Sequence, residues 1–291
     1  MSLKIWIHAA RPKTLPAGIA PVLIGTAMAY AEGRFDAAVF AAIVFAVLMI
    51  QIGTNYANDY YDFIKGADTE KRQGPVRATQ AGLVSAAAMK RAFIGVFGLA
   101  MAAGLYLVWK GGVPIIIIGL ASIACGILYT AGPFPLGYLG LGEVFVLVFF
   151  GPVAVGGTYY LQNGQINLPV LLAGLSPGLI SAALLTINNI RDYATDKIAS
   201  KKTLVVRLGV GFGRIEYDVC IAAACLIPVI LSIMTRSHYF CNAALLTCVF
   251  AFKPIRTLHI QPDAETLNRL LAQTGRLVFI YSVLFSIGWV I

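Results

Sequence analysis

Two clusters of acidic and amide side chains occur at helical spacing in the chain. They consist of Asn58, Asp59 and Asp62 and of Asn188, Asp192 and Asp196. Residues three or four apart lie on one face of a helix, so each cluster would project its oxygens to one side. Carboxylates at this spacing repel unless a cation neutralises them, and Mg2+ prefers a few carboxylate oxygens together with water and phosphate oxygens. The clusters therefore predict a site for a magnesium diphosphate.

The two clusters belong to a longer pattern that occurs twice. At an offset of 130 residues, both segments read Asn-x3-Asp, then eight residues, two adjacent basic residues, three residues and Val-Arg. The basic members are Lys71, Arg72 and Arg77 and, in the second copy, Lys201, Lys202 and Arg207. Isolated loop charges are usually only solvated, but this spacing is duplicated, which favours a function. A site in which the acids hold a metal and the bases hold phosphate oxygens would explain the duplicated spacing. An ion site of a transporter is the alternative.

Membrane-spanning helices are the elements that must position these clusters. Of the 291 residues, 59% are hydrophobic and 12% are charged, whereas soluble domains carry roughly 25% charged residues. This composition excludes a soluble globule, and long apolar runs favour helices over the alternating strands of a barrel. Helical spans need about 20 apolar residues each. The apolar windows predict nine spans, at 15–31, 37–57, 86–109, 113–130, 143–161, 169–188, 215–235, 239–252 and 272–291.

The distribution of basic residues predicts the orientation of these spans. Of the 22 Lys and Arg residues, all but Arg34, Lys110 and Arg236 fall at the N-terminus or in even-numbered loops, so the positive-inside rule places these segments in the cytoplasm. This arrangement explains the net charge of +9 without nucleic acid. Four spans separate the two clusters, which therefore reach the same membrane face. We expect one all-α domain over residues 1–291, built as two parallel four-helix repeats, at about 10–130 and 140–260, plus a ninth helix.

Two further segments could contribute to a site. Arg11 and Lys13 stand at the start of the first span, where they are either an anchor at the membrane surface or a pair of substrate contacts. The fourth loop, residues 129–143, contains much Gly and Pro and no Lys or Arg. Its Tyr129 and Tyr138 could line a pocket or lie at the membrane interface, as tyrosines often do.

The ordered set of motifs resembles the intramembrane aromatic prenyltransferases of the UbiA superfamily, and within it the branch that acts on 1,4-dihydroxy-2-naphthoate in menaquinone synthesis. The resemblance runs nearly end to end. It rests on ARPKTLPA (10–17), NDYYDFIKGAD (58–68), GPVRATQAG (74–82), YLGLGEVFVLVFFGPVAV (138–155), NNIRDYATDK (188–197) and TLVVRLG (203–209). It implies nine transmembrane helices around a central cavity, with both Asp-rich motifs facing the cytoplasm.

The resemblance also implies roles for individual residues. Magnesium ligands are expected at Asn58, Asp59, Asp62, Asn188, Asp192 and Asp196, of which Asp62, Asp192 and Asp196 are the catalytic carboxylates. Diphosphate partners are expected at Lys65, Arg72, Arg77, Arg191 and Lys201, and contacts to the aromatic acid at Arg11 and Lys13. The superfamily pattern NDxxDxxxD would end at position 66, which is Gly66, and Asp68 follows two residues later. Asp68 is therefore expected to act behind the direct ligands.

The implied reaction joins a polyprenyl diphosphate to 1,4-dihydroxy-2-naphthoate with loss of diphosphate and CO2, giving demethylmenaquinone. Mg2+ is the implied cofactor, and the implied location is a bacterial inner membrane with the site facing the cytoplasm. Another acceptor on the same scaffold, such as 4-hydroxybenzoate, homogentisate or a chlorophyllide, is the first alternative. A cation-coupled transporter is the second, although transporters place such charges near the membrane midplane rather than at helix ends.

Overall fold

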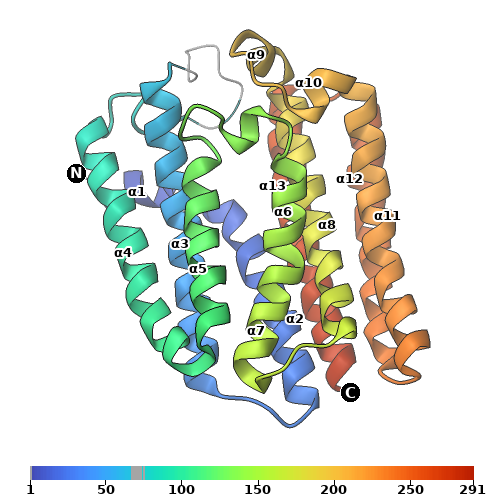
Figure 1. Cartoon of the computed structure of the whole chain (residues 1–291). Coiled ribbons are helices and arrows are strands. Elements are labelled where there is room, and N and C mark those ends of the chain that lie inside the picture. Colours follow the sequence, from blue (N-terminus) through green and yellow to red (C-terminus); the bar gives the residue numbers. More distant parts are fainter. Residues whose placement is uncertain (1, 67–73, 75) are drawn as a thin grey trace.

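A computed structural model describes residues 2–66, 74 and 76–291, so the predicted site residues Asp68 and Arg72 lie outside the described part. The described chain is a bundle of long helices that run roughly alongside one another (Figure 1). The longer helices are α2 (Leu15–Ala31), α3 (Ala37–Ile64), α4 (Ala86–Gly111), α5 (Val113–Leu128), α8 (Leu168–Arg191), α11 (Val210–Thr235), α12 (Leu246–His259) and α13 (Ala264–Val290). The shorter ones are α1 (Leu3–Ala9), α6 (Gly142–Val148), α7 (Ala154–Asn163), α9 (Tyr193–Ile198) and α10 (Leu204–Leu208).

Side-chain caps set the start of most long helices. Asp36 accepts from two backbone N–H groups at the start of α3, and Ser85, Asn167 and Asp263 cap α4, α8 and α13 in the same way. Such caps satisfy N–H groups that have no partner within the helix. The turn between α4 and α5 is a single residue, Gly112, whose φ of 68° suits glycine.

Seven segments of the described chain are long and apolar enough to cross a membrane, which makes this an integral membrane protein. They are Leu3–Ala31, Ala37–Ile64, Ala86–Gly111, Gly142–Asn163, Leu168–Arg191, Val210–Thr235 and Ala264–Val290. The predicted count of nine spans is therefore not confirmed. The two expected spans outside this set correspond to α5, a shorter apolar helix of 16 residues, and to α12, which has 14 residues and follows a 3-10 segment, Tyr239–Leu245.

The predicted span at 143–161 is a broken helix. A π-helical turn, Phe149–Val153, separates α6 from α7, and Gly151 within it has non-helical dihedral angles. Pro152 explains the break, because proline lacks an N–H and clashes with the carbonyl one turn earlier. A Cβ atom added to Gly174 of α8 would lie 2.7 Å from the Cα of Pro152. Because Gly174 has no side chain, the broken helix and α8 can approach closely at this crossing.

The hydrophobic core is divided between the two sides of the bundle. The largest buried cluster joins α2, α7, α8, α11 and α13, and two smaller clusters lie among α1 to α5. In Figure 1, α3, α4 and α5 stand on one side and α8, α11, α12 and α13 on the other, with α6 and α7 between them. The ends of α3 and α8 lie at the same end of the bundle as α9 and α10. The division into two repeats remains a prediction.

Candidate active site

A cavity of about 680 Å³ lies between the two sides of the bundle. This volume is typical of ligand-binding pockets. Its polar end is lined by Arg11, Asn58, Asp62, Arg77, Tyr138, Asn188, Asp192, Asp196 and Lys201. Along α3 the lining runs from Asp62 back to Ile43, a distance of roughly 28 Å at 1.5 Å per residue. The cavity therefore begins among charged groups and continues through most of the thickness of the bundle.

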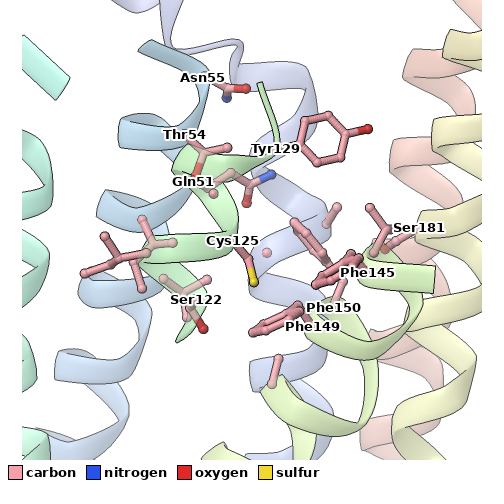
Figure 2. A pocket seen from close by; sticks show the side chains of 18 of the residues that line it. Gln51, Thr54, Asn55, Ser122, Cys125, Tyr129, Phe145, Phe149, Phe150 and Ser181 are labelled. Atoms are coloured by element: carbon pink, nitrogen blue, oxygen red, sulfur yellow. The ribbon is translucent and has the colours of Figure 1, made fainter. Parts of the chain in front are cut away.

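The deeper part of the cavity is mainly apolar, with polar groups on one wall. Figure 2 shows side chains of α3 and α5 facing three phenyl rings across the space. The polar wall contains Gln51, Thr54, Asn55, Ser122 and Cys125, and the rings are those of Phe145, Phe149 and Phe150. Phe145 and Phe149 are stacked, with ring centroids 6.2 Å apart.

The last turns of α3 bring Asn58 and Asp62 to the polar end. Asp62 is 2% exposed, and it accepts hydrogen bonds from the Arg77 guanidinium at 2.7 Å and from the Tyr138 hydroxyl at 3.3 Å. Asn58 accepts from the Thr130 hydroxyl at 2.9 Å. Asn58 and Asp62 thus face the cavity, where a cation and hydroxyl donors contact them.

Asp59 has different partners from its two neighbours. Its two carboxylate oxygens accept the backbone N–H groups of Ala78 and Thr79, at 3.0 and 3.1 Å. These bonds fasten the segment that follows Arg77 to α3. The prediction that Asp59 also binds the metal is not tested by this geometry.

The second cluster is not on one continuous helix, contrary to the expectation from its spacing. α8 ends at Arg191, Asp192 has φ −91° and ψ 7°, and Asp196 belongs to the separate helix α9. Asp192 is the residue between the two helices, and its carbonyl accepts from the Asp196 N–H at 2.7 Å and from the Thr195 hydroxyl at 2.9 Å. Asp192 and Asp196 nevertheless line the same cavity as Asp62.

Arg191 holds the end of α8 together. It is 5% exposed, and its guanidinium donates to both oxygens of Asp192 at 2.8 and 2.6 Å. The same group donates to Asn188 at 2.7 Å and to Asn268 of α13 at 2.8 Å. Arg191 does not itself line the cavity, so it acts on the cavity through Asn188 and Asp192.

The electrostatics of Asp196 show that the two clusters converge. The pKa of this carboxyl is raised to about 6, mainly by burial, and this value includes the opposing effect of the Lys201 charge and the smaller raising effects of the Asp192 and Asp62 charges. The Lys201 ammonium lies 3.5 Å from the Asp196 carboxylate. Asp62 and Asp196 come from opposite sides of the bundle, so their mutual influence places both acids in one electrostatic environment.

The loop between α5 and α6 joins the two clusters at the polar end of the cavity. The Tyr138 ring lies 5.3 Å from the Lys65 ammonium and 4.9 Å from that of Lys201. Lys65 also donates to the carbonyls of Thr130 and Gly132, at 2.7 and 2.9 Å, and burial lowers its pKa. Tyr138 therefore contacts one cation from each half of the chain and, through its hydroxyl, Asp62.

The remaining predicted residues are only partly brought to the cavity. Tyr129 lines it, and burial raises the pKa of its phenol. Arg11 lines it as well, whereas Lys13 is exposed and does not. The substrate-binding roles of these residues remain predictions.

Sequence reasoning missed a buried carboxyl beside the site. Glu143 of α6 is 6% exposed and accepts a hydrogen bond from Asn189 at 2.7 Å, and Asn189 lines the cavity. Ser181 of α8 lines the cavity too, and its buried hydroxyl has no partner in the described chain. The available signal was the position of these polar residues within apolar spans, where they are costly and usually functional.

The acids offer the hard oxygen donors that Mg2+ prefers, but each is now paired with a base. In the described residues, no three His, Cys, Asp or Glu side chains are close enough together to hold a metal by themselves. The pairs are Asp62 with Arg77, Asp192 with Arg191 and Asp196 with Lys201. Mg2+ ordinarily keeps water and phosphate oxygens in its shell. The donor set therefore fits a metal that arrives with a phosphate ligand better than a metal alone.

Comparison with known proteins identifies the family to which this chain belongs. The family model described as the UbiA prenyltransferase family matches residues 18–283, so the chain belongs to that family. A 1,4-dihydroxy-2-naphthoate octaprenyltransferase of Haemophilus influenzae is 35% identical over 303 residues, which cover 99% of this chain and 96% of the relative. The protein of the same description from Escherichia coli is 36% identical over 290 residues, covering 97% and 94%.

The fold is also found among solved structures. A UbiA homolog from Archaeoglobus fulgidus bound to GPP and Mg2+ superposes with a TM-score of 0.69 at 13% identity, covering 99% of this chain and all of the other. An apo UbiA homolog from Aeropyrum pernix gives 0.70 at 14% identity, covering 91% and 96%. At these identities the likeness establishes a shared fold.

Proposed function

We propose that this protein transfers a polyprenyl group from a polyprenyl diphosphate to 1,4-dihydroxy-2-naphthoate, releasing diphosphate and CO2 and forming the hydroquinone of demethylmenaquinone, which becomes demethylmenaquinone on later oxidation. The observation that carries the proposal is the convergence of two acid-base clusters at the polar end of a long, largely apolar cavity. Full-length relatives described as naphthoate octaprenyltransferases support the choice of acceptor.

The charged end of the cavity fits a magnesium diphosphate. Bound there, Mg2+ would neutralise the diphosphate and make it a better leaving group. Asp62, Asp192 and Asp196, with Asn58 and Asn188, are the oxygen donors we assign to the metal. Their present partners Arg77 and Lys201, together with Lys65, are then available to the phosphate oxygens. The acids and bases that pair with each other at the polar end of the cavity would thus exchange partners on binding a magnesium diphosphate.

The deeper cavity fits the prenyl chain and the aromatic acceptor. The allylic C–O bond breaks with its electron pair left on the diphosphate, and the rings of Phe145, Phe149 and Phe150 offer π faces to the resulting cation. The acceptor ring carbon that bears the carboxylate attacks, and a new C–C bond forms. The carboxylate leaves as CO2, and its bonding electrons restore the aromatic ring. Exclusion of water by the apolar walls protects the cation from hydrolysis.

We further propose nine membrane crossings, with α5 and the segment Tyr239–His259 as the two short ones. A short span is accommodated by local thinning of the bilayer. With nine crossings, the excess of Lys and Arg in the N-terminal segment and the even-numbered loops supports an N-terminus and a polar cavity end that face the cytoplasm. A bacterial inner membrane is the corresponding location.

The test is reconstitution of the purified chain in liposomes with octaprenyl diphosphate, Mg2+ and one acceptor at a time. We expect prenylated product and CO2 in equal amounts with 1,4-dihydroxy-2-naphthoate, and no turnover after chelation with EDTA. If 4-hydroxybenzoate were the only acceptor to give product, the proposed acceptor would be wrong and the proposed prenyl transfer would stand. Solute flux without release of diphosphate would instead show a transporter.

A further inference from the structure

A second pocket lies on the outer surface of the bundle, between α12 and α13. It has a volume of about 200 Å³ and is lined by Phe250, Lys253, Pro254, Gln273, Arg276 and Leu277. None of these residues belongs to the cavity described above. At about 30 Å³ per water molecule, the space would hold several waters, and so also a phosphate group.

The polar groups of this pocket are free to bind a ligand. Within the described part of the chain, the side chains of Lys253, Gln273 and Arg276 make no hydrogen bond or ion pair, and both cations are exposed. Neighbouring charges behave differently, since Arg269 pairs with Glu265 at 3.2 Å. Two cations and an amide thus converge from two helices with no acidic partner. This arrangement is complementary to an anion.

The position of the pocket along the helices indicates what kind of anion. Arg276 is 12 residues from the start of α13 at Ala264, or roughly 18 Å along the axis. Towards that start the exposed surface carries charges such as Arg256 and Arg269. Away from it the surface becomes apolar, and Phe250 and Val249 are 55% and 70% exposed. The pocket therefore lies where charged surface gives way to the lipid-facing surface.

We infer that this pocket binds the head group of an anionic phospholipid. The phosphate would lie between Lys253, Gln273 and Arg276, and an acyl chain would continue over Phe250 towards the bilayer interior. Basic pockets between helices at the membrane surface commonly bind such lipids. A free phosphate ion would use the cations but not the apolar rim, so the amphipathic shape favours a lipid. This inference does not depend on the proposed reaction.

Native mass spectrometry of the detergent-purified protein tests this inference. Phosphatidylglycerol, phosphatidylcholine with the same acyl chains, and inorganic phosphate are titrated separately. We expect one tight phosphatidylglycerol site in the wild type that is weakened about 10- to 30-fold in the double variant Lys253→Gln/Arg276→Gln, as the loss of two surface cations implies. The double variant Lys90→Gln/Arg91→Gln removes two exposed cations from α4 and should bind as the wild type does.

Three outcomes would overturn the inference. They are unchanged phosphatidylglycerol binding in the Lys253 and Arg276 variant, an equal loss in the α4 control, and inorganic phosphate or phosphatidylcholine that occupies the site as well as phosphatidylglycerol does. If the double variant fails to fold, the single variants Lys253→Gln and Arg276→Gln replace it, each with an expected weakening of about fivefold. Prenyl transfer in detergent should be the same for both double variants, which separates this site from the cavity.

Discussion

Replacing Asp59 and Asp62 separately by Asn distinguishes two roles that the sequence motif assigns to both. The two residues are 2% exposed and one turn apart on α3. Asp62 faces the cavity, whereas both oxygens of Asp59 accept backbone N–H groups of the segment after Arg77. The same chemical change should therefore have different kinetic consequences.

The magnitudes follow from the contacts. A hydrogen bond to a charged group contributes about 1.5 to 3 kcal/mol, and Asp59→Asn keeps one acceptor oxygen but turns an NH2 towards the other N–H. If the whole loss of about 2 kcal/mol of interaction free energy weakens the binding of the polyprenyl diphosphate through a misplaced Arg77, KM for that substrate rises roughly 30-fold. Asp62→Asn removes a charge from the chamber itself, and we expect kcat to fall roughly 1000-fold or more.

The assay is steady-state prenyl transfer at saturating Mg2+ with varied polyprenyl diphosphate. Asp263→Asn is the matched control, because Asp263 caps α13 by the same kind of backbone bond at an exposed position that does not line the cavity. Its kcat and KM should equal those of the wild type. If Asp59→Asn abolished kcat as completely as Asp62→Asn, Asp59 would have to bind the metal directly, and the anchoring role would be refuted.

Three other predictions concern the second cluster. Arg191→Lys keeps the charge but loses the fork that holds Asp192, so we expect at least a tenfold drop in kcat together with a lower melting temperature; unchanged kinetics would contradict the positioning role. Lys201→Ala should raise KM for the diphosphate and leave KM for the acceptor unchanged, and the opposite pattern would exclude it as a phosphate partner. Because burial raises the pKa of Asp196 to about 6 from 3.8, the folded metal-free chain binds the extra proton between these values. Its stability should therefore fall as the pH rises from about 4 to 6, and melting curves of Asp196→Asn should lack that fall.

The acid-base pairs at the polar end of the cavity also predict that Mg2+ and diphosphate bind together. Each acid is paired with a base, so a bare metal would leave a buried cation without its partner, which is costly. If metal and diphosphate bind together, the acids gain the metal as a partner and the bases gain the phosphate oxygens. We therefore expect Mg2+ alone to stabilise the protein little in a thermal melt, and Mg2+ with diphosphate to stabilise it strongly.

The class of the protein could be predicted from its sequence alone, and the sequence also proposed residues for the site. Hydropathy is a local property, so the long apolar helices were predicted close to their observed positions. The acids of the first cluster were expected on one helical face, and Asn58 and Asp62 do share the cavity wall. The four spans expected between the two clusters also predicted that both reach the same end of the bundle, because an even number of crossings returns the chain to the same side.

Only the tertiary structure decided what each site residue touches. The spacing of Asn188, Asp192 and Asp196 is helical, yet the helix is interrupted at Asp192, which separates Asn188 on α8 from Asp196 on α9. Nothing local distinguishes Asp59 from Asp62, because the backbone groups that bind Asp59 lie about 20 residues further along the chain. Tyr138 contacts Lys65 and Lys201, which are more than 60 residues away on either side. Periodicity reports which residues share a face of one helix, whereas these pairings depend on how separate helices pack.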